Sequence, residues 1–384
     1  MRDRIHINPD VLKWARITSG KSINDVAAVF KKKPEIIERW ESGTESLTYT
    51  QLETIAYTVY KRPIAIFFFP SPPAEKTLES EFRTLPAEDA QNIDPDTRLH
   101  IRKAHSFQLS LAELNDNVNP VANPIFKSLK ADSEVTAFTG QVRQLLGFSL
   151  AEQKRIINAD DAFKTWREHI ESAGIFVFKS SFKNKGVCGF SLFDDEFPIV
   201  YINNSNPFTR QIFTLIHELC HILIKVSGIF YLDETILNRL SNSNRDIEVF
   251  CNRFAAELLL PDADFIREYK GDYSDKAISS LAALYCVSRE VILRRLLDKR
   301  IISKEYYGEK TEEWNAQINP KSKKTDGHYY NTQIAYLGEN YIKLAFKAYY
   351  QGKCTFENLT EYLNMKANNI QKLEYEYLPK MVVK

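Results

Sequence analysis

Two histidines and a glutamate near the middle of the chain have the residue types and spacing of a metal-dependent hydrolase. They lie in the run His217-Glu218-Leu219-Cys220-His221. Because residues four apart share one face of a helix, both imidazoles can bind one metal ion, for which zinc is the natural choice. Zinc would then accept a third protein ligand and a water. Glu218 is placed to take a proton from this water, whose pKa zinc lowers towards about 7.

A second helix downstream, over residues 246–260, offers the third ligand. It carries two candidates, Glu248 and Glu257, which are nine residues apart. They therefore lie about 180° apart around the helix and cannot both face the first helix. The face of Glu248 also carries Ala255, whose small side chain would let the two helices approach closely. This favours Glu248 as the ligand and leaves Glu257 as the alternative, or as a solvated helix charge.

The helix that holds the two histidines must be a core helix with one polar edge. It is expected to begin near Pro207, because proline suits a first-turn position. The polar residues that share one stripe are Arg210, Thr214, His217 and His221. The apolar residues on the other side are Ile212, Phe213, Ile216, Leu219, Cys220 and Leu223. Cys220 is thus expected to be a buried, unreactive thiol.

The two helical segments together resemble the ImmA/IrrE family of zinc metallopeptidases. The resemblance rests on Phe213 to His221, followed after 26 intervening residues by Glu248 to Pro261. It implies Zn²⁺ held by His217, His221 and Glu248, with Glu218 as the catalytic base. It also implies a regulatory endopeptidase whose protein substrate is a repressor or an antitoxin-like regulator.

Residues 9–70 predict a bundle of four or five short helices, two of which form a helix-turn-helix. The residues whose order resembles the XRE family of DNA-binding domains are Arg16, Gly20 to Ser22, Val26, Ala27, Ile37 and Trp40 to Gly43. This resemblance implies that residues 9–70 bind double-stranded DNA. The cationic side chains expected to contact it are Lys31, Lys32, Lys33 and Arg39.

The second helix of this motif also carries Glu35 and Glu38, which would repel phosphate. The alternative is therefore a small helical domain used for partner docking or for dimerisation, which would allow a homodimer.

The overall fold is expected to be mainly α with a small β-sheet, an α+β class. It would comprise an N-terminal helix-turn-helix bundle, a zincin-like metallopeptidase core and a helical C-terminal region. The expected divisions are residues 1–73 for the helix-turn-helix domain, 74–130 for a helical connector, 131–262 for the metallopeptidase, 263–305 for a second helix-turn-helix-like segment and 306–384 for a linker and the C-terminal helices. The linker itself is expected over the polar residues 309–326.

Three strands are expected before the metal-binding helix, at residues 175–179, 187–192 and 198–202. In zinc peptidases a substrate chain commonly adds to an exposed sheet edge, and the resemblance to them implies that residues 186–192 form this edge. Candidates for stabilising the oxyanion are Tyr201, Arg210 and Tyr231, among which the sequence does not decide.

The composition excludes several other classes of protein. A formal net charge of +1 over 384 residues predicts no general attraction to nucleic acid or membranes. The longest apolar run, Ile64 to Phe69, is too short to span a bilayer, and the N-terminus does not have the pattern of a signal peptide. Five cysteines without regular spacing indicate reduced thiols. A cytoplasmic protein without a membrane partner is expected.

The sequence therefore predicts a regulatory zinc-dependent endopeptidase coupled to an N-terminal DNA-binding domain. The alternative is a DNA-binding transcriptional regulator or antitoxin whose zinc site is structural, sensory or nearly inactive.

Overall fold

The computed structural model describes residues 4–129, 134–232, 239–317 and 328–382. The chain is divided into two compact units, residues 1–103 and residues 104–384. The boundary between them falls within the long helix α7 (Pro95–Leu114). The described residues are mainly helical, with one two-stranded and one four-stranded sheet, so the predicted α+β class is confirmed. Among the described residues, no helix combines the length and apolar character that crossing a membrane requires.

The first unit is a bundle of short helices around a core of buried side chains that includes Leu12, Val26, Ile37, Trp40 and Phe67. Its elements are β1 (Arg4–Ile5), α1 (Pro9–Thr18), α2 (Ile23–Phe30), α3 (Pro34–Glu41), β2 (Leu47–Thr48), α4 (Tyr49–Glu53), the π-helix η1 (Thr54–Tyr60), the 3₁₀-helix η2 (Ile64–Phe68), α5 (Leu78–Glu81) and α6 (Ala87–Gln91). The helices α2 and α3 are the predicted helix-turn-helix.

The turn between α2 and α3 is closed by the backbone. Lys31 lies in the left-handed region with φ 51°, and the N–H of Lys32 donates to the carbonyl of Ala27 over 3.0 Å. This is the hydrogen bond of a Schellman closure, which satisfies a carbonyl that the end of the helix would otherwise leave unpaired. At the other end of α2, Ser22 and Asp25 form a reciprocal capping box.

The same turn recurs twice in the second unit. Cys286, with φ 54°, follows α15 (Asp275–Tyr285) and leads into α16 (Arg289–Asp298). Asn364, with φ 48°, follows α20 (Phe356–Leu363) and leads into α21 (Ala367–Glu376). The first of these helix pairs falls in residues 263–305, where the sequence predicted a helix-turn-helix-like segment, and the second falls among the predicted C-terminal helices.

The second unit is built on a four-stranded sheet in the order β3-β5-β4-β6. Its strands are β3 (Phe176–Ser180), β4 (Val187–Leu192), β5 (Ile199–Asn203) and β6 (Gly228–Tyr231). β3 and β5 are parallel, and β4 is antiparallel to both of its neighbours. Because β4 is paired on both sides, the prediction that residues 186–192 form the sheet edge is wrong. Among the described strands, β6 lies at that edge.

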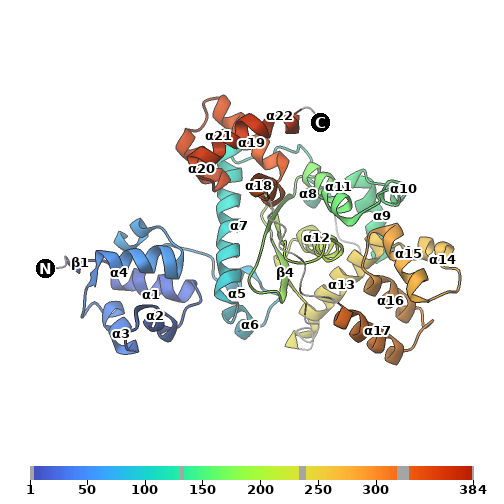
Figure 1. The fold of residues 1–384 in the computed structure, drawn as a ribbon, viewed down its shortest axis with the longest axis horizontal. Coiled ribbons are helices and arrows are strands. Elements are labelled where there is room, and N and C mark those ends of the chain that lie inside the picture. The colour runs from blue at the N-terminus through green and yellow to red at the C-terminus, as the bar shows by residue number, and fades with distance from the viewer. Residues whose placement is uncertain (1–3, 130–133, 233–238, 318–327, 383–384) are drawn as a thin grey trace. The chain divides into compact units, whose positions relative to one another are not determined.

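Helices cover both faces of this sheet (Figure 1). The helix α12 (Phe208–Leu223) packs on one face, followed outward by α11 (Ala159–Ser172), α13 (Asn242–Leu259) and α9 (Val135–Leu146). An aromatic cluster covers the opposite face, where Phe107 of α7 and Tyr341 of α19 contact Phe178, and Phe190 stacks on Tyr201. The apolar side of α12 therefore lies inside the main core, as its sequence predicts.

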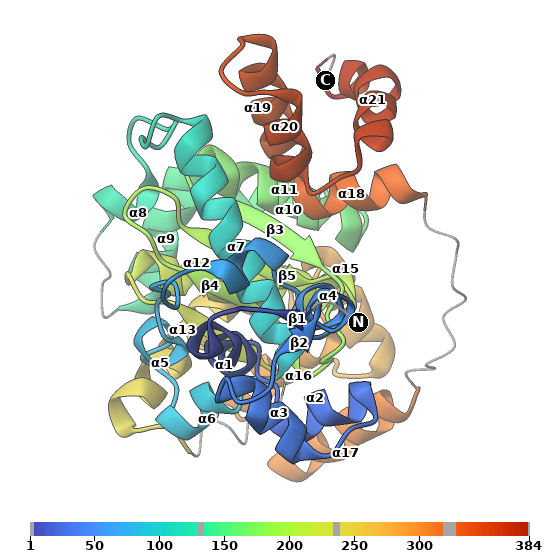
Figure 2. The same cartoon turned by 90° about the vertical axis from the view of Figure 1, so that its left-hand side faces the viewer.

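Further helices complete the unit. They are α8 (Ile125–Ser128), α10 (Leu150–Gln153), α14 (Asp262–Glu268), α17 (Lys304–Gln317), α18 (Tyr329–Leu337), α19 (Glu339–Tyr350) and α22 (Leu378–Val382). Figure 2 shows α18 beside β3, with α19 to α21 following it. The predicted linker is wrong for residues 309–317, which belong to α17, and residues 318–326 lie outside the described part of the chain.

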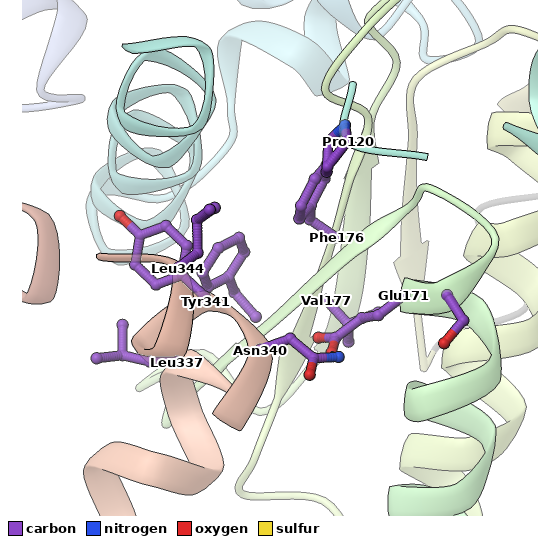
Figure 3. Close-up of a pocket in the computed structure, with 10 residues that line it drawn as sticks. Pro120, Glu171, Phe176, Val177, Leu337, Asn340, Tyr341 and Leu344 are labelled. Carbon is purple, nitrogen blue, oxygen red and sulfur yellow. The ribbon is translucent and has the colours of Figure 1, made fainter. Parts of the chain in front are cut away.

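A cavity of about 200 Å³ lies between β3 and the helices α18 and α19 (Figure 3). Its lining combines apolar side chains such as Phe176 and Leu344 with the polar Glu171 and Asn340, and Asn340 donates to Glu171 over 2.8 Å. None of the residues predicted to have a chemical role lines this cavity.

Candidate metal centre

Helices α12 and α13 bring the three predicted ligands together. His217 and His221 lie one turn apart on α12, and their Nε2 atoms are 3.2 Å apart. From α13, Glu248 places Oε2 3.3 Å from Nε2 of His217 and Oε1 3.3 Å from Nε2 of His221. All three residues are buried. Among the described residues, no other group of His, Cys, Asp or Glu side chains lies close enough together to hold a metal ion.

The spacing of these donor atoms fits zinc. Zinc–nitrogen and zinc–oxygen bonds of about 2.0–2.1 Å in tetrahedral geometry place neighbouring donor atoms about 3.3–3.4 Å apart. The separation of 3.2 Å between the two Nε2 atoms agrees with that value, and each of these nitrogens also has one of the two oxygens of Glu248 at 3.3 Å. Two imidazoles and one carboxylate also match the donor set of catalytic zinc sites, which leave one position for water or substrate.

The electrostatics of the cluster favour a neutral His217 and an ionised Glu248, as metal binding needs. Burial lowers the pKa of His217, which keeps its ring neutral. Burial opposes ionisation of Glu248, but the imidazoles of His221 and His217 outweigh it and lower the pKa of the carboxyl. Glu248 is therefore an anion, and it offers one oxygen to each histidine. Burial lowers the pKa of His221, but Cys251 and Glu248 outweigh it and raise this pKa, so the imidazole of His221 would give up a proton when a metal binds.

Asn252 orients the first of the two rings. It lies one turn after Glu248 on α13, and its Oδ1 is 3.1 Å from Nδ1 of His217. An amide oxygen can only accept, so Nδ1 carries the hydrogen, and Nε2 is left with a lone pair that a metal ion held by Glu248 could accept. Hydrogen bonds of this kind fix the tautomer and the ring orientation of metal-binding histidines.

Glu257, the alternative ligand, is directed away from the histidines. Its Oε1 accepts from the N–H of Asp262 over 3.0 Å, and its Oε2 is 3.2 Å from Nη2 of Arg295. The side chain is only 8% exposed, so the expectation of a solvated helix charge is wrong. Glu257 instead helps to fix the end of α13.

The C-terminal end of α13 is held by side chains from three other helices. Arg295 of α16 donates to the carbonyl of Leu260 over 2.6 Å, and Gln153 of α10 donates to that of Leu259 over 2.9 Å. Arg143 of α9 donates to the carbonyl of Leu258. These bonds satisfy carbonyls that have no partner within the helix. They also hold α13 in place, and with it Glu248.

Glu218, the predicted base, is fully buried beside the ligands. Its Oε2 accepts a hydrogen bond from the hydroxyl of Ser191 over 2.6 Å, whereas Oε1 has no bond of standard hydrogen-bond geometry to the described residues. Burial raises the pKa of Glu218 to about 8, although the hydroxyl of Ser191 acts in the opposite direction. A carboxyl group whose pKa lies near neutral pH can both take up and release a proton during a reaction.

Strand β6 covers the two histidines from the side of the sheet. The ring of Phe230 lies 4.3 Å from that of His217, measured between centroids. Gly228 lies so close to the other ring that an added Cβ would be 2.7–2.8 Å from imidazole atoms of His221. Neither contact was predicted, because no strand was expected after the helix that carries the histidines.

The structure separates the three candidates for stabilising an oxyanion. Tyr201 stacks on Phe190 on the sheet face opposite to α12, so it lies away from the ligands. Tyr231 follows Phe230 on β6, and side-chain alternation directs it to the face opposite to His217. Arg210 alone lies on the polar stripe of α12, where its Nη2 is 3.8 Å from Glu290.

The predicted DNA-binding residues lie in the first unit. Lys31, Lys32 and Lys33 are exposed and form the turn between α2 and α3. Arg39 lies in the last turn of α3, with its side chain 58% exposed and 4.0 Å from Glu45. These four cations therefore belong to one helix-turn-helix.

Comparison with known protein families is consistent with the chemistry of the second unit. Residues 170–297, one third of the chain, match the peptidase family M78 model, which is described as the IrrE N-terminal-like domain. The matched segment runs from the end of α11 into α16. It contains the three candidate metal ligands, His217, His221 and Glu248, and the candidate base Glu218. No curated protein matches the chain. The match supports the resemblance to the ImmA/IrrE family over this region of the chain.

Proposed function

We propose that this protein is a regulatory zinc endopeptidase that hydrolyses a peptide bond in a partner protein. The observation that supports it most directly is the meeting of two Nε2 atoms and the carboxylate of Glu248 at 3.2–3.3 Å, beside a buried glutamate with one free oxygen. His217, His221 and Glu248 would hold the metal. When bound, zinc would polarise the peptide carbonyl and acidify a water.

Glu218 would perform the proton transfers. Its Oε1 takes a proton from the attacking water, whose oxygen then bonds to the peptide carbonyl carbon. As the carbon–nitrogen bond breaks, the same carboxyl returns the proton to the leaving amine. The buried position of Glu218 suits both steps, because burial brings its pKa close to neutral pH.

The substrate class follows from the family resemblance. We propose a repressor or an antitoxin-like regulator as the protein that is cleaved, so that hydrolysis would change gene expression. The match to a peptidase family supports the reaction class, and the partner protein is the part of this proposal that the cleavage experiment must identify.

A second candidate function is DNA binding by residues 9–70, as in the XRE family. It is supported by the closed turn between α2 and α3, with its three exposed lysines. In this alternative the protein is a transcriptional regulator or antitoxin, and its metal site is structural, sensory or nearly inactive. The two functions are compatible, since a DNA-binding domain could bring the peptidase to a repressor on its operator.

Metal content tests the ligand set. We expect about one zinc per chain in the wild type by mass spectrometry, lost in Glu248→Gln and retained in Glu257→Gln. Both variants replace a carboxylate by an amide of the same shape, so each is the control for the other. Absence of zinc from the wild type after zinc is supplied would refute the peptidase proposal.

Cleavage tests the role of Glu218. The zinc-loaded wild type should cut a repressor or antitoxin from its own genetic neighbourhood, and Glu218→Gln should bind zinc but leave that protein intact. Biological activity that persists in Glu218→Gln would favour the DNA-binding alternative.

A further inference from the structure

Ser191 lies against Glu218 although 27 positions separate them in the chain. Both residues are completely buried, and the hydroxyl oxygen of Ser191 is 2.6 Å from Oε2 of Glu218. The backbone of Ser191 is held on both sides by the sheet, since it pairs with Val200 of β5 and with Gly228 of β6. The hydroxyl is therefore presented to Glu218 from a rigid position.

The surrounding donors determine the direction of this hydrogen bond. The N–H of Gly228, which can only donate, lies 3.2 Å from Oγ of Ser191. A hydroxyl has one hydrogen and can accept as well as donate. Because its oxygen accepts from Gly228, the hydrogen of Ser191 is free to point at Oε2 of Glu218. Ser191 is thus a hydrogen-bond donor to Oε2, and the bond is charge-assisted whenever the carboxyl of Glu218 is ionised.

This arrangement makes the two oxygens of Glu218 different. The hydroxyl of Ser191 holds Oε2 and the backbone N–H of Phe230 also acts on the carboxyl, whereas Oε1 is buried and has no bond of standard hydrogen-bond geometry to the described residues. A buried, unpaired oxygen costs free energy unless a ligand or a water supplies a donor. Oε1 is therefore the oxygen left to interact with a molecule that enters the site.

We infer that Ser191 is a positioning residue, which holds Oε2 of Glu218 so that Oε1 receives the proton of the attacking water. This inference rests on the proposed function, in which Glu218 is the base. In the step, the O–H bond of the water breaks and its proton moves to Oε1. The electron pair stays on the water oxygen, which bonds to the carbonyl carbon, and Ser191 keeps its own proton throughout.

The test compares Ser191→Val with Ser191→Thr in the full-length protein. Both residues are β-branched and nearly equal in shape, but only threonine keeps the hydroxyl, so their difference isolates the hydrogen bond. The probe is acetohydroxamic acid, which gives up a proton to a neighbouring base when it binds a zinc site. We expect its affinity for the zinc-loaded protein to fall about tenfold or more in Ser191→Val, and to stay within about threefold of the wild type in Ser191→Thr.

Two controls separate failure of this inference from failure of the proposed function. Zinc affinity should be unchanged in both Ser191 variants, because Ser191 contacts no ligand atom. Glu218→Gln should weaken the binding of acetohydroxamic acid as strongly as Ser191→Val does. If Glu218→Gln lowers the affinity for the probe but Ser191→Val binds the probe as tightly as Ser191→Thr does, the inference is overturned. If Glu218→Gln has no effect in a zinc-loaded protein, the proposed role of Glu218 fails instead.

A metal-free measurement tests the contact itself. Urea unfolding of Ser191→Val, Glu218→Gln and the double variant forms a double-mutant cycle, which isolates the coupling between the two side chains. We expect a coupling of about tenfold in the folding equilibrium. A coupling below about twofold would overturn the inference. If the extra methyl group prevents folding of both β-branched variants, Ser191→Ala replaces Ser191→Val in each measurement.

Discussion

His217 directs Nε2 towards Glu248 because Asn252 holds the opposite nitrogen of the ring at 3.1 Å. Removing this acceptor frees the ring to rotate and to change tautomer. We expect Asn252→Ala to lower zinc affinity by about 10–100-fold, the usual effect of losing such a contact. Competition with a chromogenic chelator measures the change. Asn242→Ala, at the exposed start of α13, is the control, and equal affinities in the two variants would contradict this role.

Gly228 is expected to tolerate no side chain. A Cβ would lie 2.7–2.8 Å from atoms of the His221 imidazole, which cannot move away without leaving Glu248. Gly228→Ala should therefore lower zinc affinity and reduce the free energy of unfolding by about 1–3 kcal/mol. Chelator competition and urea unfolding measure these two effects.

Gly140 is the matched control for this substitution. It lies in α9, and a Cβ there would meet no atom within 4 Å. Gly140→Ala should raise the free energy of unfolding by about 0.5–1 kcal/mol, because glycine is unfavourable in a helix. A similar gain in Gly228→Ala would mean that β6 does not lie against His221.

Lys179 on β3 should make stability depend on pH. Its side chain is only 4% exposed, and its ammonium group lies over the rings of Phe163 and Phe208. Burial lowers the pKa of Lys179 to about 7. Among the charged groups around it, Arg167 and Lys164 lower the pKa further, whereas Asp160 raises it.

The sign of the effect follows from proton binding. Between pH 7 and the ordinary lysine pKa of 10.5, the unfolded chain binds a proton that the folded chain does not. The free energy of unfolding therefore rises with pH through this window. We expect Lys179→Met to stabilise the protein at pH 6 by about 3 kcal/mol more than at pH 10. Urea unfolding at both pH values measures it, and Lys185→Met, at an exposed lysine, should show no such difference.

The residues of the site differ in how well the sequence could predict them. His217 and His221 follow from helical spacing, because a ligand pair four residues apart needs only one helix. Glu248 was favoured over Glu257 by the small residue on its face and by the family resemblance. Ser191 and Gly228 could not be predicted in the same way. Their contacts with Glu218 and His221 depend on the register between β4 and β6, which is set by pairing across the sheet.

At the scale of elements, the turn between α2 and α3 is where DNA binding can be tested. Lys31→Asn with Lys32→Gln and Lys33→Gln removes three charges, and asparagine tolerates the left-handed backbone at position 31. If these lysines contact phosphates, affinity should fall for all duplex sequences. The slope of log affinity against log salt should fall by about 2–3, near 0.9 for each lost contact.

Lys61→Asn is the control for the lysine variant. Lys61 belongs to the same unit and also has a left-handed backbone, with φ 52°, but it lies outside the turn. Removing its charge should leave the salt slope of the wild type nearly unchanged. If the triple variant and Lys61→Asn give the same slope, the turn does not contact DNA.

The elements themselves were predicted unevenly. Strands β3, β4 and β5 have apolar runs bounded by turn residues, and the sequence analysis placed all three within one residue of their bounds. The short strand β6 was missed because it follows α12 after only a brief turn and has just four residues. With β6 paired to its outer side, β4 is an inner strand, and among the described strands the two edges of the sheet are β3 and β6.

At the scale of the whole molecule, the candidate metal site and the helix-turn-helix belong to different compact units. The family match begins at residue 170 and so lies entirely within the second unit. The five divisions expected from the sequence remain a prediction. The division into two units implies that a ligand bound to one unit can stabilise that unit against unfolding without stabilising the other.

Calorimetry of the full chain can test this independence. We expect two unfolding transitions, one for each unit, and saturating zinc should raise the temperature of only one of them. A ligand at 100 times its Kd adds about 2.7 kcal/mol to the unit that binds it, because only the folded form has the site. Glu248→Gln should abolish the shift and leave the other transition in place. If zinc moves both transitions together, the two units unfold cooperatively, and metal binding in the second unit can then control the stability of the helix-turn-helix.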